Sequence, residues 1–153
     1  TALDYKMFLP KGFQWTTLVE MQLSNQSLLP SEQMGLGGYN TVRGYEERQL
    51  NADDGLLVST ALHFPKWHFL KNKGKHKITD SCECLLFFDY GLAHDNHRLP
   101  DEAQTNYLMS AGPGLRYAIE NYLSARLDWG IKLHRDQFPG GWSMLHFSVV
   151  GSF

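Results

Sequence analysis

The chain has 153 residues, with 14 basic and 16 acidic side chains and a formal net charge of −2 when the histidines are neutral. This near-balance argues against a nucleic acid as the main partner, because domains that bind nucleic acids carry an excess of basic residues. Apolar residues make up 42% of the chain and aromatic residues 13%, and no apolar run approaches the roughly 20 residues that a membrane-spanning helix requires.

Apolar and polar residues alternate through most of the chain, and a sustained period of two predicts β-strands. A short strand is predicted over residues 3–9, followed by a turn at 10–12 and a longer strand over 13–23. Further strands are predicted over 56–64, 82–92, 107–119, 122–133 and 145–153. No convincing helical pattern, internal repeat or low-complexity segment accompanies them, so the predicted fold is all-β and antiparallel.

A glycine-rich segment interrupts this alternation and predicts a long loop over about 27–55. Residues 29–45 read LPSEQMGLGGYNTVRGY, which is too polar and too rich in glycine for a strand. A loop of this length usually has a function of its own. The one basic residue of the stretch 29–45, Arg43, lies between Val42 and Gly44, and we expect this cation to have an anionic partner.

Two other residue clusters each allow a functional and a structural interpretation. Cys82 and Cys84 point to the same face of a predicted strand, but without a second cluster we favour two small apolar residues over a redox or metal pair. The basic stretch 66–77 is better explained as a solvated turn between strands than as a nucleic-acid patch, so no nucleic-acid partner is predicted.

A possible metal site and possible hydrolytic chemistry also have little support in the sequence. His94 and His97 lie near Asp101 and Glu102, but the residues around them predict an irregular loop rather than a helix that presents both imidazoles. Neither a Gly-x-Ser-x-Gly elbow nor a His-Glu-x-x-His helix is present. We therefore predict no enzyme, no catalytic residue, no metal and no cofactor.

Strand length and loop asymmetry favour a membrane barrel. Strands of roughly ten residues suffice to cross a bilayer at a tilt, and short turns alternate with the long loops predicted at 27–55 and 93–106, as in outer-membrane barrels. The polar face of the later strands carries a charged row that would line a water-filled lumen. This row consists of Arg116, Glu120, Arg126, Asp128 and Lys132. A soluble antiparallel module that binds an apolar ligand stays open as an alternative, because its strands alternate in the same way.

Two sequence motifs carry a family resemblance. Residues 37–45, GGYNTVRGY, resemble the Val-Arg-Gly-Tyr/Phe signature in the sixth external loop of the BamA-like superfamily of outer-membrane barrels. Residues 87–91, FFDYG, resemble the Phe-x-Asp-x-Gly motif of strand thirteen in the same barrels. Segments 112–116 and 125–130 are similar to the following strands, and Phe153 is similar to the terminal aromatic residue that the barrel-assembly machinery recognises. The motif residues are Gly37, Gly38, Val42, Gly44 and Tyr45 in the loop, and Phe87 and Gly91 in the strand.

Within this superfamily, residues 29–38 are most similar to the two-partner secretion transporters of the haemolysin-activator type. The resemblance implies a sixteen-stranded barrel in the bacterial outer membrane, embedded in lipid, through which an unfolded partner polypeptide passes. Residues 1–153 would form the C-terminal part of this barrel, about strands eleven to sixteen, without the periplasmic POTRA domains of the family. A BamA-like insertase is the alternative within the superfamily. Pro113 cannot donate a ladder hydrogen bond, so it predicts a bulge or a local break.

The strand pattern supplies a partner for the loop arginine. Asp89 shares a face with Glu83, opposite an apolar row, and would therefore point into the lumen, where an unpaired carboxylate is costly. Glycines allow the loop to fold tightly back into the lumen, so that Arg43 can form a bidentate ion pair with Asp89. We call this pair the latch and predict that it holds the loop inside the barrel. The structural alternative is an ion pair with no role in transport.

Overall fold

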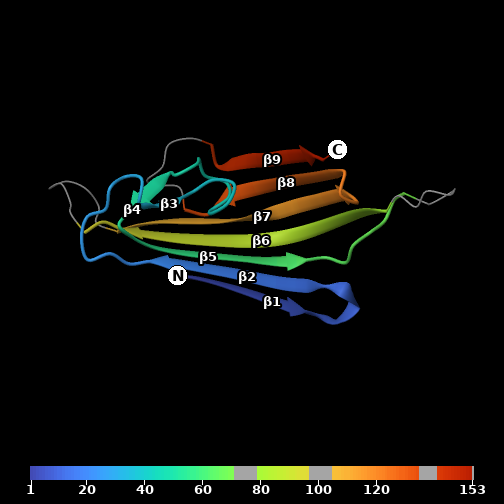
Figure 1. Cartoon of the computed structure of the whole chain (residues 1–153), viewed down its shortest axis with the longest axis horizontal. Helices are drawn as coiled ribbons and strands as arrows, with labels where there is room; N and C mark the ends of the chain where they lie inside the picture. The colour runs from blue at the N-terminus through green and yellow to red at the C-terminus, as the bar shows by residue number, and fades with distance from the viewer. Residues whose placement is uncertain (71–78, 97–104, 135–140, 153) are drawn as a thin grey trace.

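A computed structural model describes residues 1–70, 79–96, 105–134 and 141–152 of the chain. Seven strands form one sheet in the order β1-β2-β5-β6-β7-β8-β9, and all neighbours in it are antiparallel (Figure 1). These strands are β1 (Ala2–Phe8), β2 (Gln14–Gln22), β5 (Asp54–His63), β6 (Asp80–His94), β7 (Thr105–Ile119), β8 (Leu123–Lys132) and β9 (Ser143–Gly151). The prediction of an all-β antiparallel fold is confirmed.

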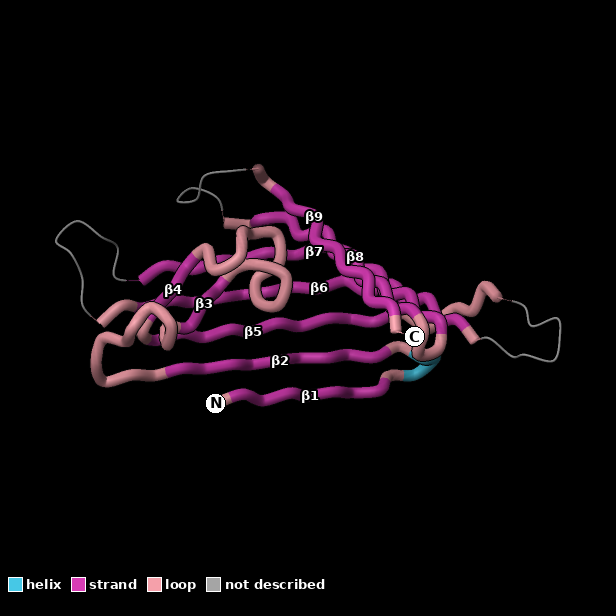
Figure 2. The backbone as a smooth tube through the Cα atoms, turned by 45° about the horizontal axis from the view of Figure 1, so that its top comes forward, coloured by secondary structure: helices cyan, strands magenta, loops and turns pink. Residues whose placement is uncertain are grey.

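The long loop between β2 and β5 lies on one face of the sheet, which we call the inner face (Figure 2). The loop contains a small separate sheet of two short strands, β3 (Met34–Leu36) and β4 (Leu50–Ala52). The sequence prediction that this segment contains no strand was therefore wrong for these residues. A three-residue strand is too short to give a periodic signal, and its pairing partner lies across the loop.

Alternation along the strands separates the inner face from an apolar outer face. On β6, Leu85 and Phe87 are buried on the inner face, whereas Leu86 is 51% and Phe88 37% exposed on the outer face. Trp129 and Phe147 extend the exposed apolar surface over β8 and β9. Large apolar side chains left in contact with water over several strands mark a surface that is covered by another apolar phase or partner.

Several details of the strands and turns differ from the sequence predictions. Residues 2–8 pair with β2 along their whole length. The sheet therefore has seven strands, one more than the six, about strands eleven to sixteen of the barrel, that the family resemblance implies. β5 begins at Asp54, two residues before the predicted strand, and β6 continues to His94, two residues beyond the predicted one. Glu120 follows the end of β7, with φ 44° and an exposed side chain that accepts from the Thr79 amide at 2.9 Å. Glu120 therefore belongs to the turn between β7 and β8 and does not line the inner face.

Pro113 produces the local break that its missing N–H predicts. Pairing between β7 and β8 is present at Ala111↔Ile131 and resumes at Gly114↔Asp128, with the register unchanged. The missing pairs involve Gly112 and Pro113, and no residue is inserted, so the feature is a break and not a bulge. On its other side β7 pairs with β6 without interruption.

Several predicted features lie partly or wholly outside the described residues. These are residues 71–77 of the basic stretch 66–77, the residues His97, Asp101 and Glu102, and the terminal residue Phe153. Cys82 and Cys84 are both free cysteines. Among the described residues, no group of three or more His, Cys, Asp or Glu side chains could hold a metal ion. No helix in this part of the chain has the length and apolar character needed to cross a membrane.

The apolar outer face predicts that the purified chain requires detergent or lipid. Without either, we expect it to aggregate, because the exposed outer-face side chains would associate with those of other copies. Size-exclusion chromatography and circular dichroism, with and without detergent, measure this directly. A chain that stays monomeric and keeps its β-sheet signal in buffer alone would contradict the assignment of this face to lipid.

Candidate functional site

An apolar cluster holds the loop on the inner face. Leu36, Val42 and Tyr45 of the loop are fully buried against Leu57 of β5 and Leu108 of β7. Burial of three such side chains contributes on the order of 5 kcal/mol before the entropy of ordering the loop is subtracted. The loop is thus packed like a protein core and does not extend into solvent.

The two ends of the loop are tied together by Asp53, which is 2% exposed. Its Oδ1 accepts from the Leu28 amide at 2.8 Å and from Gln33 Nε2 at 3.1 Å. Its Oδ2 accepts from the Asn96 amide at 3.2 Å, which adds the segment that follows β6. A carboxylate with several N–H donors is well stabilised when buried. Asp53, which the sequence analysis did not identify, therefore fixes the base of the loop.

Arg43 at the tip of the loop meets Asp89 of β6. The guanidinium is bidentate, with Nε 2.7 Å from Asp89 Oδ2 and Nη2 2.7 Å from Oδ1. The Arg43 amide also donates to Oδ2 at 3.1 Å, and the Ser59 hydroxyl of β5 donates to Oδ1 at 2.6 Å. Arg43 is 6% exposed and Asp89 fully buried, and the guanidinium stacks 3.6 Å from the Phe87 ring centroid. The two residues that the sequence pattern paired thus lie in contact.

A second buried carboxylate, Asp128 of β8, extends this ion pair into a network. Its Oδ2 accepts from Arg126 Nε at 2.6 Å and its Oδ1 lies 2.9 Å from Arg116 Nη1. Arg43 Nη1 lies 3.7 Å from the same Oδ1. Sequence alternation placed Arg116, Arg126 and Asp128 on one face, but the approach of Arg43 to Asp128 depends on where the loop lies across the sheet.

Close backbone contact requires glycine on both the loop and the strands. Gly44 has φ 95°, which favours glycine, and packs on Gly130 of β8. A Cβ atom at Gly130 would lie 2.3 Å from the Gly44 nitrogen. A Cβ atom at Gly91 of β6 would lie 2.8 Å from Val42 Cγ2. The sequence analysis identified Gly44 and Gly91 from the motifs but missed Gly130.

Tyr45 anchors the other side of the loop tip. Its hydroxyl donates to the His134 carbonyl at 2.5 Å and accepts from the Met109 amide at 3.3 Å. Burial raises the pKa of the Tyr45 phenol, so the group stays protonated and keeps its donor. Lys132 is 4% exposed, with its Nζ 5.0 Å from the Tyr45 ring centroid. Lys132 thus faces the loop and contributes little to an open polar surface.

Two residues of β9 also contact the loop, and the sequence analysis missed both roles. The Gly44 amide donates to His146 Nε2 at 3.0 Å, so this nitrogen acts as an acceptor. The Tyr39 hydroxyl lies 2.6 Å from Ser148 Oγ. His146 and Ser148 are two residues apart in a predicted strand and so lie on its polar face, and this spacing is the sequence signal that could have identified them. Gly37 and Gly38 have φ of 103° and 105° and shape the turn before Tyr39.

Comparison with known proteins gives one family match and similar individual proteins. Residues 2–117 match the family described as haemolysin secretion/activation protein ShlB/FhaC/HecB. The heme/hemopexin transporter protein HuxB of Haemophilus influenzae is 29% identical over 136 residues, which are 82% of this chain and 23% of HuxB. HuxB of strain 86-028NP is 28% identical over 120 residues, which are 76% of this chain and 20% of that protein. The chain thus spans about a quarter of the length of these curated relatives.

A solved structure shares the fold of the whole described sheet. CdiB from Escherichia coli superposes with a TM-score of 0.78 at 19% sequence identity, covering 97% of this chain and 26% of CdiB. At this identity the likeness concerns the fold. It agrees with the antiparallel sheet described above.

The contact between Gly44 and Gly130 predicts the effect of a single added methyl group. Gly130→Ala should displace the loop tip, because the new Cβ would overlap loop backbone that cannot rotate away, at a cost of about 1–3 kcal/mol. Hydrogen exchange of the loop amides in detergent would then be faster than in the wild type. Gly151→Ala on β9 is the matched control, because the nearest atom to its Cβ would be 3.9 Å away. Equal loop protection in Gly130→Ala and the wild type would contradict the packing described here.

Proposed function

The chain belongs to the haemolysin secretion/activation family ShlB/FhaC/HecB, and from this premise we propose that it forms part of a bacterial outer-membrane translocator barrel. Residues 1–153 contribute the strands, and the segment 27–55 is an external loop that returns into the lumen. The barrel passes an unfolded partner polypeptide and contacts outer-membrane lipid with its outer face, and the barrel-assembly machinery inserts it. The barrel conducts this polypeptide without a chemical step, which agrees with the transporter names of the chain's relatives.

The observation that carries this proposal is the buried pair of Arg43 and Asp89 beneath a loop that covers the inner face. A charged, loop-filled inner face opposite an apolar outer face is what a lipid-embedded, water-filled barrel requires. A soluble module would leave the outer face unexplained. The family match likewise favours secretion over the insertase alternative.

The latch fixes the position of the loop and so defines the free space of the lumen. Asp89 is fully buried, and without the Arg43 guanidinium its charge would retain only the Ser59 hydroxyl and the backbone amide of residue 43 as donors. Removing one partner of such a pair costs on the order of 3 kcal/mol, because the other charge is left poorly solvated. The loop is therefore held firmly, yet by contacts that an exchange of ion partners can release.

Charge exchange tests whether this pairing matters for transport. In the full-length transporter, Arg43→Asp and Asp89→Arg should each reduce secretion of the partner polypeptide several-fold, since each leaves two like charges in a buried site. The double variant should recover part of the secretion. Partial recovery is expected because Arg43 also approaches Asp128, which the exchange does not change. Quantitative immunoblotting of secreted and cell-bound partner measures the effect at matched barrel levels.

Glu46→Arg is the matched control for this experiment, because it reverses an exposed charge in the same loop. It should secrete like the wild type. Defects in both single variants with no recovery in the double variant, at unchanged barrel levels, would tell against direct pairing. Wild-type secretion in both single variants would show that the ion pair has no role in transport.

A further inference from the structure

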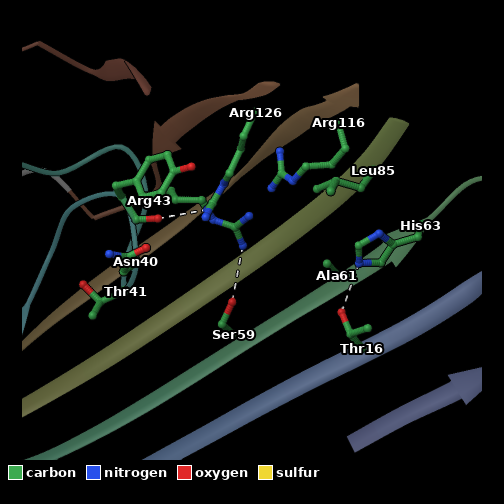
Figure 3. A pocket seen from close by; sticks show the side chains of 11 residues that line it. Thr16, Asn40, Thr41, Arg43, Ser59, Ala61, His63, Leu85, Arg116 and Arg126 are labelled. Atoms are coloured by element: carbon green, nitrogen blue, oxygen red, sulfur yellow. Dashed lines mark hydrogen bonds between the residues drawn. The ribbon is translucent and has the colours of Figure 1, made fainter. Parts of the chain in front are cut away.

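Two adjoining cavities lie on the inner face next to the loop tip. The first has a volume of about 180 Å³ and opens between Thr41 of the loop and the strands β2, β5, β6, β7 and β8 (Figure 3). The second has a volume of about 430 Å³ and extends between β6, β7, β8 and β9. Tyr39, Arg116 and Arg126 line both cavities and so form the boundary between them.

The two arginines at this boundary keep unused hydrogen-bonding capacity. Both share the single carboxylate of Asp128, and their side chains remain 27% and 26% exposed. Beyond Asp128, Arg116 Nη1 donates to the carbonyls of Leu115 and Leu127, and Arg126 Nη2 donates to the Tyr39 carbonyl. Arg116 Nε and Arg126 Nη1 have no partner among the described residues. Asp128 thus fixes both guanidinium groups in place while leaving donors directed away from it.

The charges around the cavities do not cancel. The lining contains the cations Arg43, Arg116, Arg126 and Lys66 and one carboxylate, Glu83. Two further carboxylates, Asp89 and Asp128, contact these arginines from beneath. Four cations therefore face three carboxylates, which leaves one positive charge when His63 is neutral. Glu83 is already held by His63 and Lys66, so it does not neutralise the arginine pair.

From this geometry we propose that Arg116 and Arg126 form a carboxylate-binding site that contacts Asp and Glu side chains of the polypeptide during its passage. The proposal rests on the translocation function proposed above. A guanidinium with free N–H groups matches a carboxylate in shape and charge. The site lies on the inner face, so lipid headgroups on the opposite side of the sheet are not its ligands.

Neighbouring groups fit an extended peptide that carries such a carboxylate. Ser124 and Ser148 line the larger cavity and offer hydroxyls to a peptide backbone. The Tyr39 ring, which lies 3.8 Å from the Arg126 guanidinium carbon, keeps that side chain in position. Both guanidinium groups remain about one quarter exposed, so each contact is partly screened by water. Binding is therefore weak and reversible, as a chain in transit requires.

Single-channel recording on the full-length transporter in a planar lipid bilayer tests the site. The probes are two unstructured peptides of equal length, one built from Gly, Ser and Glu and the other with Gln in place of Glu. We expect the Glu peptide to block the current about tenfold longer per event, the effect of one charge-assisted hydrogen bond. Raising the salt concentration should shorten these events.

Variants assign this difference to the two arginines. Arg116→Gln and Arg126→Gln should each remove most of the difference between the peptides, while Asp128 keeps the other arginine and Arg43 as partners in either case. Lys6→Gln is the matched control, because it removes one positive charge from β1. Lys6 pairs with Thr16, which lines the first cavity, but Lys6 itself lines neither cavity. Unchanged unit conductance and unchanged blocking by the Gln peptide would show that a variant barrel is intact.

Equal blocking by the two peptides in the wild-type transporter would overturn the carboxylate site, whatever the variants do. The same holds if both arginine variants keep the full difference. Failure of the translocation function is distinguishable, because it would appear as a wild-type transporter that does not secrete its partner polypeptide from cells. Normal secretion with no peptide discrimination would reject the site alone.

Discussion

A buried ion pair between a loop and a strand constrains this structure more than any other contact. Arg43 and Asp89 are almost completely removed from water, and a buried charge is tolerated only with a well-placed partner. The loop tip must therefore lie where the guanidinium meets the carboxylate in bidentate geometry. That position brings Gly44 against Gly130 and places Tyr45 in the apolar cluster. Charge pairing, backbone contact and apolar packing thus support one position of the loop.

In this position the loop connects five strands of the sheet. It meets Ser59 on β5, Asp89 on β6, Met109 on β7, Asp128 on β8 and His146 on β9. Because contacts to five neighbouring strands are made at once, release of the loop would alter the inner face across all of them. The outer face is unaffected by these contacts, since its apolar side chains point away from the loop. In the barrel that we propose, the lumen can therefore change while the outer face stays the same.

Much of this arrangement follows from the sequence, because a period of two assigns each strand residue to a face. Alternation placed Asp89 on the polar face, and this position supplied a partner for Arg43. Alternation does not predict over which strands of the sheet the loop lies. For that reason Gly130 and His146 were missed, and the approach of Arg43 to Asp128 was not foreseen. Glu120 was assigned to the inner face because the pattern continued past the residue at which β7 ends.

The position of the docked loop depends on direct coupling between Arg43 and Asp89. A double-mutant cycle with Arg43→Gln and Asp89→Asn in the full-length protein, measured as the free energy of loop opening by hydrogen exchange, tests it most directly. We predict a coupling free energy on the order of 2–3 kcal/mol, so that the double variant loses far less loop stability than the two single variants lose together. Additive effects, with a coupling near zero, would show that the loop is held by other contacts and would contradict the central claim.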